Sequence, residues 1–78
     1  MLSKRTFVNY GMNENIRDGY RIACVDMFGS PIAWFKGYYN HKFGEFTLYP
    51  QSVVVPGAME IGVIKVSAFE MKSKKIGR

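Results

Sequence analysis

The sequence contains very few of the residues that build metal sites and disulfides. Its 78 residues include one cysteine, Cys24, and one histidine, His41. A single cysteine forms no internal disulfide, and a structural zinc site of the usual type needs four Cys or His ligands. We therefore expect neither a disulfide scaffold nor a zinc finger, and no metal or other cofactor.

Long apolar runs are also missing. No segment approaches the roughly 18 apolar residues that a membrane span needs. Residues 1–7 carry two basic side chains but no apolar stretch after them, so we expect no secretory signal. These absences favour a cytoplasmic protein that does not contact membranes.

Catalytic patterns are equally scarce. The six acidic residues are scattered, and the chain has no phosphate-binding loop and no dinucleotide fingerprint. Cys24 and His41 resemble a nucleophile and a base. However, Cys24 lies in an apolar strand, which favours a buried structural thiol, and His41 lies in a polar turn, which favours a solvated side chain. We therefore expect a non-enzymatic protein with no catalytic residues.

The charge is concentrated at the C-terminus. Lys plus Arg is 11 and Asp plus Glu is 6, a formal net charge of +5. The basic tail, residues 72–78, contains no acid and four cations, Lys72, Lys74, Lys75 and Arg78. Lys4 and Arg5 form a second basic cluster, which joins the first if the termini lie close together. Such a patch attracts nucleic acid, anionic membranes or acidic proteins, and a solubilising tail is the alternative.

The remaining sequence is typical of a small all-β or β-dominated domain. Alternating apolar residues predict strands over 6–10, 20–27, 32–39 and 45–49. Turn residues at 28–31 join the second and third strands into a hairpin. We expect Pro50 to end the fourth strand, and residues 53–55 to form a short edge or an ordered loop. Residues 59–71 predict a fifth strand, with a helix as the competing interpretation.

We expect residues 1–78 to form a single domain. We expect a single antiparallel sheet of about five strands, for which a curled barrel is one possible form, with at most one short helix. Residues 11–18 are expected to form a loop or a helical turn. The expected core consists of Ile22, Val25, Trp34, Phe35, Leu48, Ile61, Val63 and Phe69. Twelve aromatic residues exceed the needs of so small a core, so we expect some to be exposed or buried in a homodimer.

Aromatic and basic residues alternate over residues 34–43. Single-stranded nucleic acid is held by this combination, because bases stack on rings while cations contact phosphates. The sequence therefore predicts an RNA or polyanion site in which Tyr38 and Tyr39 stack on bases. The expected phosphate contacts are Lys4, Arg5, Lys36, Lys42, Lys72, Lys74, Lys75 and Arg78.

The two ends of the chain carry a family resemblance. The basic start Met-Leu-Ser-Lys-Arg-Thr-Phe, the short length and the basic end Lys-Ser-Lys-Lys resemble small bacteriophage proteins of the toxIN-inhibitory factor A type. The resemblance implies a counter-defence function. Such proteins neutralise the endoribonuclease toxin of a toxin-antitoxin system that has an RNA antitoxin, and they bind RNA as well as the toxin.

Two other functions remain open from the residues themselves. A protein–protein inhibitor of a host enzyme would use an aromatic surface or a strand edge, and would have no affinity for nucleic acid. A virion or assembly component would pack its basic tail against nucleic acid or an acidic partner.

Overall fold

β-Strands make up most of the described chain. The computed structural model describes residues 6–11, 19–57 and 62–73. Its elements are β1 Thr6–Asn9, β2 Tyr20–Val25, β3 Pro31–Asn40, β4 Glu45–Val53, β5 Ile64–Ser67, the 3-10 turn η2 Ala68–Glu70, and β6 Lys72–Ser73. The predicted β-dominated fold class is confirmed. In the described ranges no helix is long and apolar enough to span a membrane.

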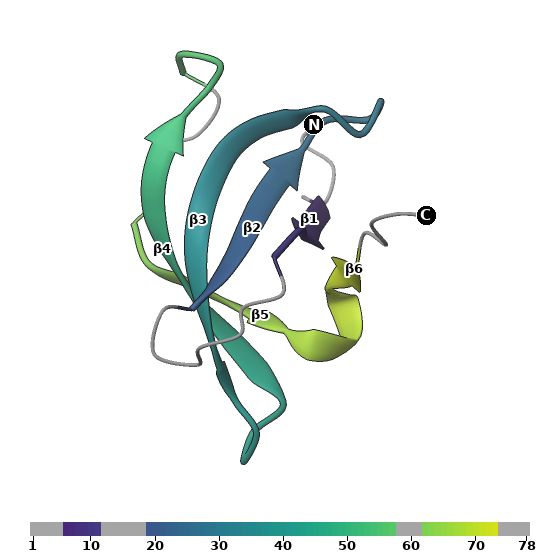
Figure 1. Cartoon of the computed structure of the whole chain (residues 1–78), viewed down its shortest axis with the longest axis vertical. Helices are drawn as coiled ribbons and strands as arrows, with labels where there is room; N and C mark the ends of the chain where they lie inside the picture. Colours follow the sequence, from purple (N-terminus) through teal and green to yellow (C-terminus); the bar gives the residue numbers. More distant parts are fainter. Residues whose placement is uncertain (1–5, 12–18, 58–61, 74–78) are drawn as a thin grey trace.

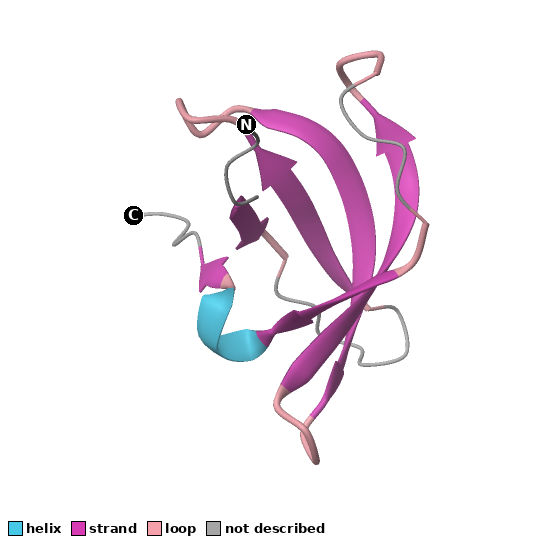
Figure 2. Cartoon of the chain, turned by 180° about the vertical axis from the view of Figure 1, so that it is seen from behind, coloured by secondary structure: helices cyan, strands magenta, loops and turns pink. Residues whose placement is uncertain are grey.

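The strands form one curled sheet in the order β5-β4-β3-β2-β1-β6. Strands β1 to β5 pair antiparallel with their neighbours, whereas β6 pairs parallel to β1 through Val8↔Lys72. The short η2 turn joins β5 to β6, although these strands lie at opposite ends of the strand order. The sheet therefore curls toward closure, as Figures 1 and 2 show from opposite sides.

The predicted hairpin is present. Ile22 pairs with Phe35 and Ala23 with Trp34. In the turn between β2 and β3, the Asp26 carboxylate accepts hydrogen bonds from the backbone N–H groups of Phe28 and Ser30, both at 2.9 Å. Gly29 has a φ of 85°, which glycine adopts without the steric cost of a Cβ atom.

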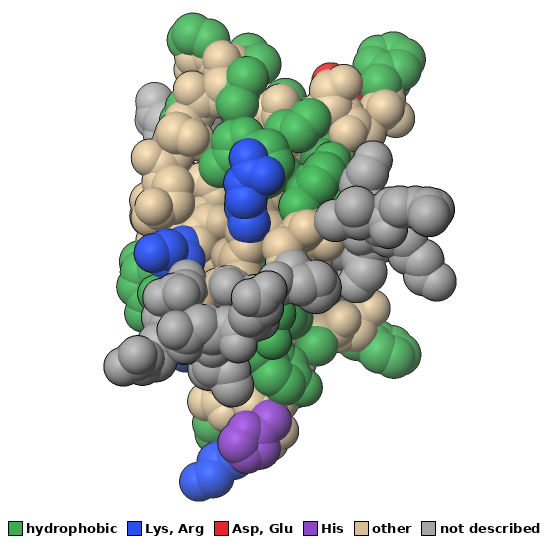
Figure 3. Space-filling model, in the orientation of Figure 1, with side chains coloured by type: hydrophobic (Ala, Val, Ile, Leu, Met, Phe, Trp, Pro, Cys, Tyr) green, Lys and Arg blue, Asp and Glu red, His purple; other side chains and the backbone are tan. Residues whose placement is uncertain are grey.

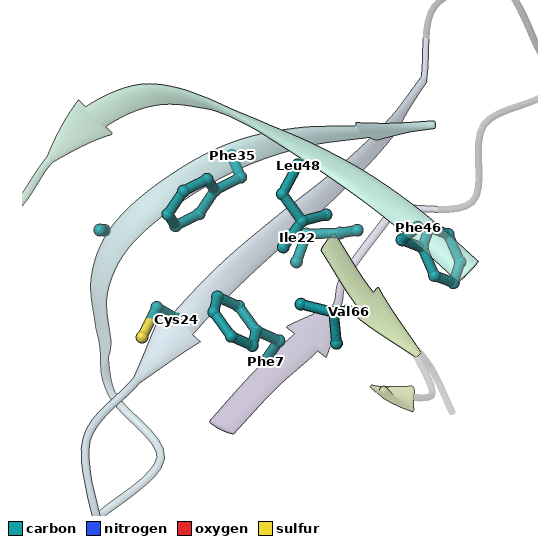
Figure 4. Close-up of a cluster of buried hydrophobic side chains, with 8 residues drawn as sticks. Phe7, Ile22, Cys24, Phe35, Phe46, Leu48 and Val66 are labelled. Carbon is teal, nitrogen blue, oxygen red and sulfur yellow. The ribbon is translucent and has the colours of Figure 1, made fainter. Parts of the chain in front are cut away.

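The concave side of the sheet holds the core (Figure 4). Its buried cluster consists of Phe7, Ile22, Cys24, Ala33, Phe35, Phe46, Leu48 and Val66. Gly37 lies at the centre of this side, where an added Cβ would overlap Ile22 Cδ1 and lie 2.9 Å from Leu48 Cδ2. The core expectations for Ile22, Val25, Phe35 and Leu48 are confirmed.

Three other core expectations are wrong. Phe69 is 95% exposed and Val63 is 54% exposed. Val63 precedes β5 and Phe69 lies in η2, so neither side chain is aligned with the inward positions of a strand. Trp34 is only half-buried, because it has the opposite strand parity from the inward residues Ala33 and Phe35. Ile61 lies outside the described residues.

The fourth strand does not end at Pro50. It continues to Val53, and its register with β3 shifts where the partner changes from Pro50 to Ser52. Strand β5 pairs with β4 only as far as Leu48. Proline is tolerated at edges and bulges because its missing N–H interrupts no ladder bond there. Beyond Val53, the backbone N–H groups of Val54 and Val55 bond to the Ile32 carbonyl, so this segment is an ordered loop.

The predicted strand over 59–71 is shorter than expected. Within residues 62–71, β5 occupies 64–67 and η2 occupies 68–70, and residues 62, 63 and 71 belong to no strand. Residues 59–61 lie outside the described ranges. The Ser67 side chain accepts a hydrogen bond of 3.1 Å from Phe69 N, which caps the turn and ends the strand. Residues 12–18, for which a loop or helical turn was expected, also lie outside the described ranges.

Candidate nucleic-acid interface

The convex side of the sheet has a different composition from the core side. Successive side chains along a strand point to opposite sides, so residues that alternate with the buried ones lie on the convex side. We call this surface the outer face. Its members include Val8, Tyr10, Arg21, Ala23, Trp34, Lys36, Tyr38, Glu45, Thr47, Tyr49 and Lys65.

Strand pairing places these side chains in rows. One row contains Arg21, Lys36 and Tyr49, which are register partners across β2, β3 and β4. The next row toward the β3–β4 turn contains Tyr38, Thr47 and Lys65 on β3, β4 and β5. Neighbouring strands lie about 4.8 Å apart, so charged and aromatic side chains of adjacent strands are within contact range.

Trp34 is flanked by two side chains of the outer face. The Arg21 Cζ atom lies 4.0 Å from the centroid of the Trp34 ring, a cation–π stack. The Tyr10 ring meets the Trp34 ring edge-on, with 5.3 Å between centroids and an interplanar angle of 64°. The guanidinium is exposed and rests on a half-buried indole. This packing holds an exposed cation in a defined position.

A second aromatic pair lies further along β3. The Tyr38 and Tyr49 rings are 5.8 Å apart in a T-shaped arrangement. Tyr49 is 42% exposed. Lys36 lies between the two aromatic groups along β3, and its side chain is exposed.

On the described part of the outer face the cations lie near the middle of the strands, whereas the acid Glu45 lies on the same face at the start of β4, next to the β3–β4 turn. Arg21, Lys36 and Lys65 are exposed members of the outer face. The acids lie at the ends of elements: Asp26 in the β2–β3 turn, Glu45 at the start of β4, and Glu70 in η2. Figure 3 shows Lys and Arg side chains among hydrophobic ones over the middle of the sheet, with acidic atoms at its upper edge. The middle of this face therefore favours an anionic ligand.

The structure brings together some of the predicted site residues. Lys36 and Tyr38 share the outer face, two positions apart on β3. Tyr39 points to the other side of the strand, where its ring lies 5.0 Å from the Phe46 ring. Lys42 lies in the β3–β4 turn, at the tip of the hairpin.

The terminal cations are described in part. Lys72 belongs to β6, of which the backbone is described. The predicted contacts outside the described residues are Lys4, Arg5, Lys74, Lys75 and Arg78.

Sequence reasoning missed several members of this surface: Tyr10, Arg21, Trp34, Tyr49 and Lys65. The signal was present in strand parity. Arg21 alternates with the apolar Ile22 and Cys24, so it had to lie on the opposite side from them. Its proximity to Trp34 depends on the β2–β3 register, which the turn between these strands sets.

Cys24 and His41 do not lie together. Cys24 is 2% exposed and is the register partner of Ala33, near the start of β3. His41 is exposed in the turn that follows the other end of β3. Over residues 6–11, 19–57 and 62–73, no three His, Cys, Asp or Glu side chains gather at a distance that would hold a metal ion.

The fold and the outer face thus define a small curled-sheet domain with a basic, aromatic surface. Comparisons with protein-family models, curated proteins and solved structures give no match to the chain.

Proposed function

We propose that this protein is a non-enzymatic, phage-type counter-defence protein that binds RNA or another polyanion and inhibits a bacterial endoribonuclease toxin. The observation that supports RNA binding is the combination of exposed Arg21 and Lys36 with half-buried Trp34 and Tyr38 on one sheet face. The toxin and the bacterial cytoplasm as its place of action follow from the resemblance to the toxIN-inhibitory factor A type.

The basic ends extend this proposal. Residues 4 and 5 precede β1, and the basic tail follows β6, which is the neighbour of β1 in the sheet. Lys4, Arg5, Lys72, Lys74, Lys75 and Arg78 would add phosphate contacts to those of the outer face. Lys42 and Tyr39 would add contacts from the β3–β4 hairpin.

Fluorescence anisotropy of a labelled single-stranded RNA at low and high salt tests RNA binding. Counterion release predicts that log K falls by about 0.7 per log unit of salt for each phosphate contact. The double variant Arg21→Gln/Lys36→Gln should weaken binding and reduce this slope by about 1.4, twice the value for one contact.

The control variant is Val63→Glu together with Phe69→Glu, which changes the net charge by the same amount. These side chains are 54% and 95% exposed, before β5 and in η2. Equal losses in the two double variants would assign binding to net charge and not to the outer face. No binding by the full chain at low salt would contradict the proposal.

Inhibition is tested by RNA cleavage with a purified endoribonuclease toxin of an RNA-antitoxin system. The protein should slow cleavage, and the outer-face variant should inhibit less. Undiminished inhibition by that variant would support a protein–protein inhibitor that acts without nucleic acid. Growth of the assembly with concentration, measured by light scattering, would support a virion or assembly component.

We further propose a homodimer. Exposed apolar side chains lie at the same end of β3: Met27 and Phe28 in the β2–β3 turn, Val53 at the end of β4, and Val54 and Val55 after it. Burying these side chains against a second copy would remove apolar surface from water. A fixed dimer mass over a range of concentrations is expected, and a monomer mass throughout would contradict it.

A further inference from the structure

The Arg21–Trp34 stack presents a guanidinium to solvent as a flat surface. Since Arg21 lies over the Trp34 ring at 4.0 Å, the indole supports one face of the guanidinium. The Arg21 side chain is exposed to solvent. Nucleobases stack on guanidinium planes as well as on aromatic rings. The group available to a base at this position is therefore Arg21, and Trp34 is its support.

The Tyr38–Tyr49 pair provides a second platform at a fixed separation. Trp34 and Tyr38 are both on β3, four residues apart, which corresponds to roughly 13 Å at 3.3 Å per residue. Lys36 lies halfway between them on the same side of the strand. A cation is thus positioned between two stacking platforms.

We propose that the outer face recognises single-stranded RNA whose bases are splayed apart. One base stacks on Arg21, a second and non-adjacent base stacks on the Tyr38–Tyr49 pair, and the Lys36 ammonium contacts the backbone between them. This inference rests on the proposed RNA binding and specifies the form of RNA that the face accepts.

Geometry favours a single strand over a duplex. Bases stacked in a helix rise by about 3.4 Å each, so only bases about four positions apart would match the roughly 13 Å between the platforms. A base can stack on either platform only if one of its own faces is exposed, and in a duplex the neighbouring bases cover those faces. Proteins that bind duplex RNA instead read its shape and its 2′-hydroxyl and phosphate groups across the minor groove.

The decisive variant is Arg21→Lys, which keeps the charge and removes the planar group. Its affinity for a single-stranded RNA should fall roughly tenfold, the loss expected for one stacking contact, with an unchanged salt slope. The control is Phe69→Leu, a conservative change at a 95% exposed side chain of η2 that lies outside the outer face, and it should leave the affinity unchanged. Circular dichroism and thermal unfolding confirm that both variants fold.

The ligands are a single-stranded RNA, the same strand annealed to its complement, and the same strand with abasic nucleotides. The full chain should bind the intact single strand at least tenfold more tightly than the other two. If all three bind equally and Arg21→Lys has no effect, base stacking is contradicted while polyanion binding stands. If no ligand binds at low salt, this inference and the proposed RNA binding are both contradicted.

Discussion

The Arg21 guanidinium carbon lies 4.0 Å from the centroid of the Trp34 ring, so a cation on β2 rests on the single tryptophan of the chain on β3. Ala23 pairs with Trp34 and Arg21 with Lys36, so the stack runs diagonally across the two strands. The position of the Arg21 guanidinium on the outer face therefore depends on the register between β2 and β3. A shift of one residue in this register would separate the two side chains and turn Arg21 toward the core side.

Gly37→Ala should destabilise the domain by about 1–3 kcal/mol, the usual cost of overpacking. A Cβ at this position would overlap Ile22 Cδ1 and lie 2.9 Å from Leu48 Cδ2, and both of these side chains are fully buried. Ile22 Cδ1 and Leu48 Cδ2 would both have to shift within the core. Urea unfolding followed by circular dichroism measures the change.

The control is Gly62→Ala, because a Cβ at Gly62 meets no atom within 4 Å. This variant should unfold at the same urea concentration as the original chain or slightly above it. Equal stability of Gly37→Ala and Gly62→Ala would contradict the packing described around Gly37.

Two phenylalanines that the sequence assigns alike to the core should respond differently to replacement by leucine. Phe35 is 2% exposed, and Phe35→Leu should lower the free energy of unfolding by about 1–2 kcal/mol through lost burial and a residual cavity. Phe69 is 95% exposed, and Phe69→Leu should change it by less than about 0.5 kcal/mol. Urea unfolding compares the two variants. A similar cost at both positions would show that Phe69 is packed.

Removal of the basic tail should weaken RNA binding without unfolding the domain. The truncated variant should end at Ser73, because Lys72 and Ser73 form β6 and pair with β1. Loss of Lys74, Lys75 and Arg78 should reduce the salt slope by up to about 2.1, or 0.7 for each phosphate contact. Anisotropy at several salt concentrations measures this slope. An unchanged slope would indicate that the tail only raises solubility.

Lys42 tests whether RNA extends from the outer face to the hairpin tip. It lies in the β3–β4 turn, whereas Lys36 lies between the two aromatic platforms. Lys36→Gln should therefore cost more affinity for a short RNA than Lys42→Gln, although both remove one charge. A longer RNA should recover sensitivity to Lys42. Anisotropy with RNAs of increasing length checks this order, and a larger loss for Lys42→Gln on the shortest RNA would reverse it.

The fold class was predictable because local patterns are strong in this chain. Ile22 and Cys24 alternate with exposed or outward residues, and a turn centred on Gly29 joins β2 to β3. The extent of β4 was less predictable. Pro50 ends a strand only if a neighbouring strand requires a hydrogen bond from the backbone N–H that proline lacks. Which strands lie beside Pro50 is decided by the tertiary fold and not by the local sequence. The parallel strand β6 could not be predicted either, because it pairs with a strand more than sixty residues earlier through Val8↔Lys72. This pairing forms only when the sheet curls.

The candidate site was predictable only along one strand. Lys36 and Tyr38 are close in sequence and remain close in the structure. Arg21 and Tyr49 join them through strand pairing, which residue order alone does not specify. Trp34 was assigned to the core because a large aromatic ring is usually buried. Its strand parity places it on the outer face instead.

Trp34 provides the most direct measurement of whether RNA occupies the outer face. It is the single tryptophan of the chain, so its emission reports on this surface alone. Titration with an unlabelled single-stranded RNA should quench or shift the emission, with the same midpoint as the anisotropy curve and the same weakening at high salt. An anisotropy curve that shows binding while Trp34 emission stays constant would contradict this account, because the RNA would then be bound elsewhere on the molecule.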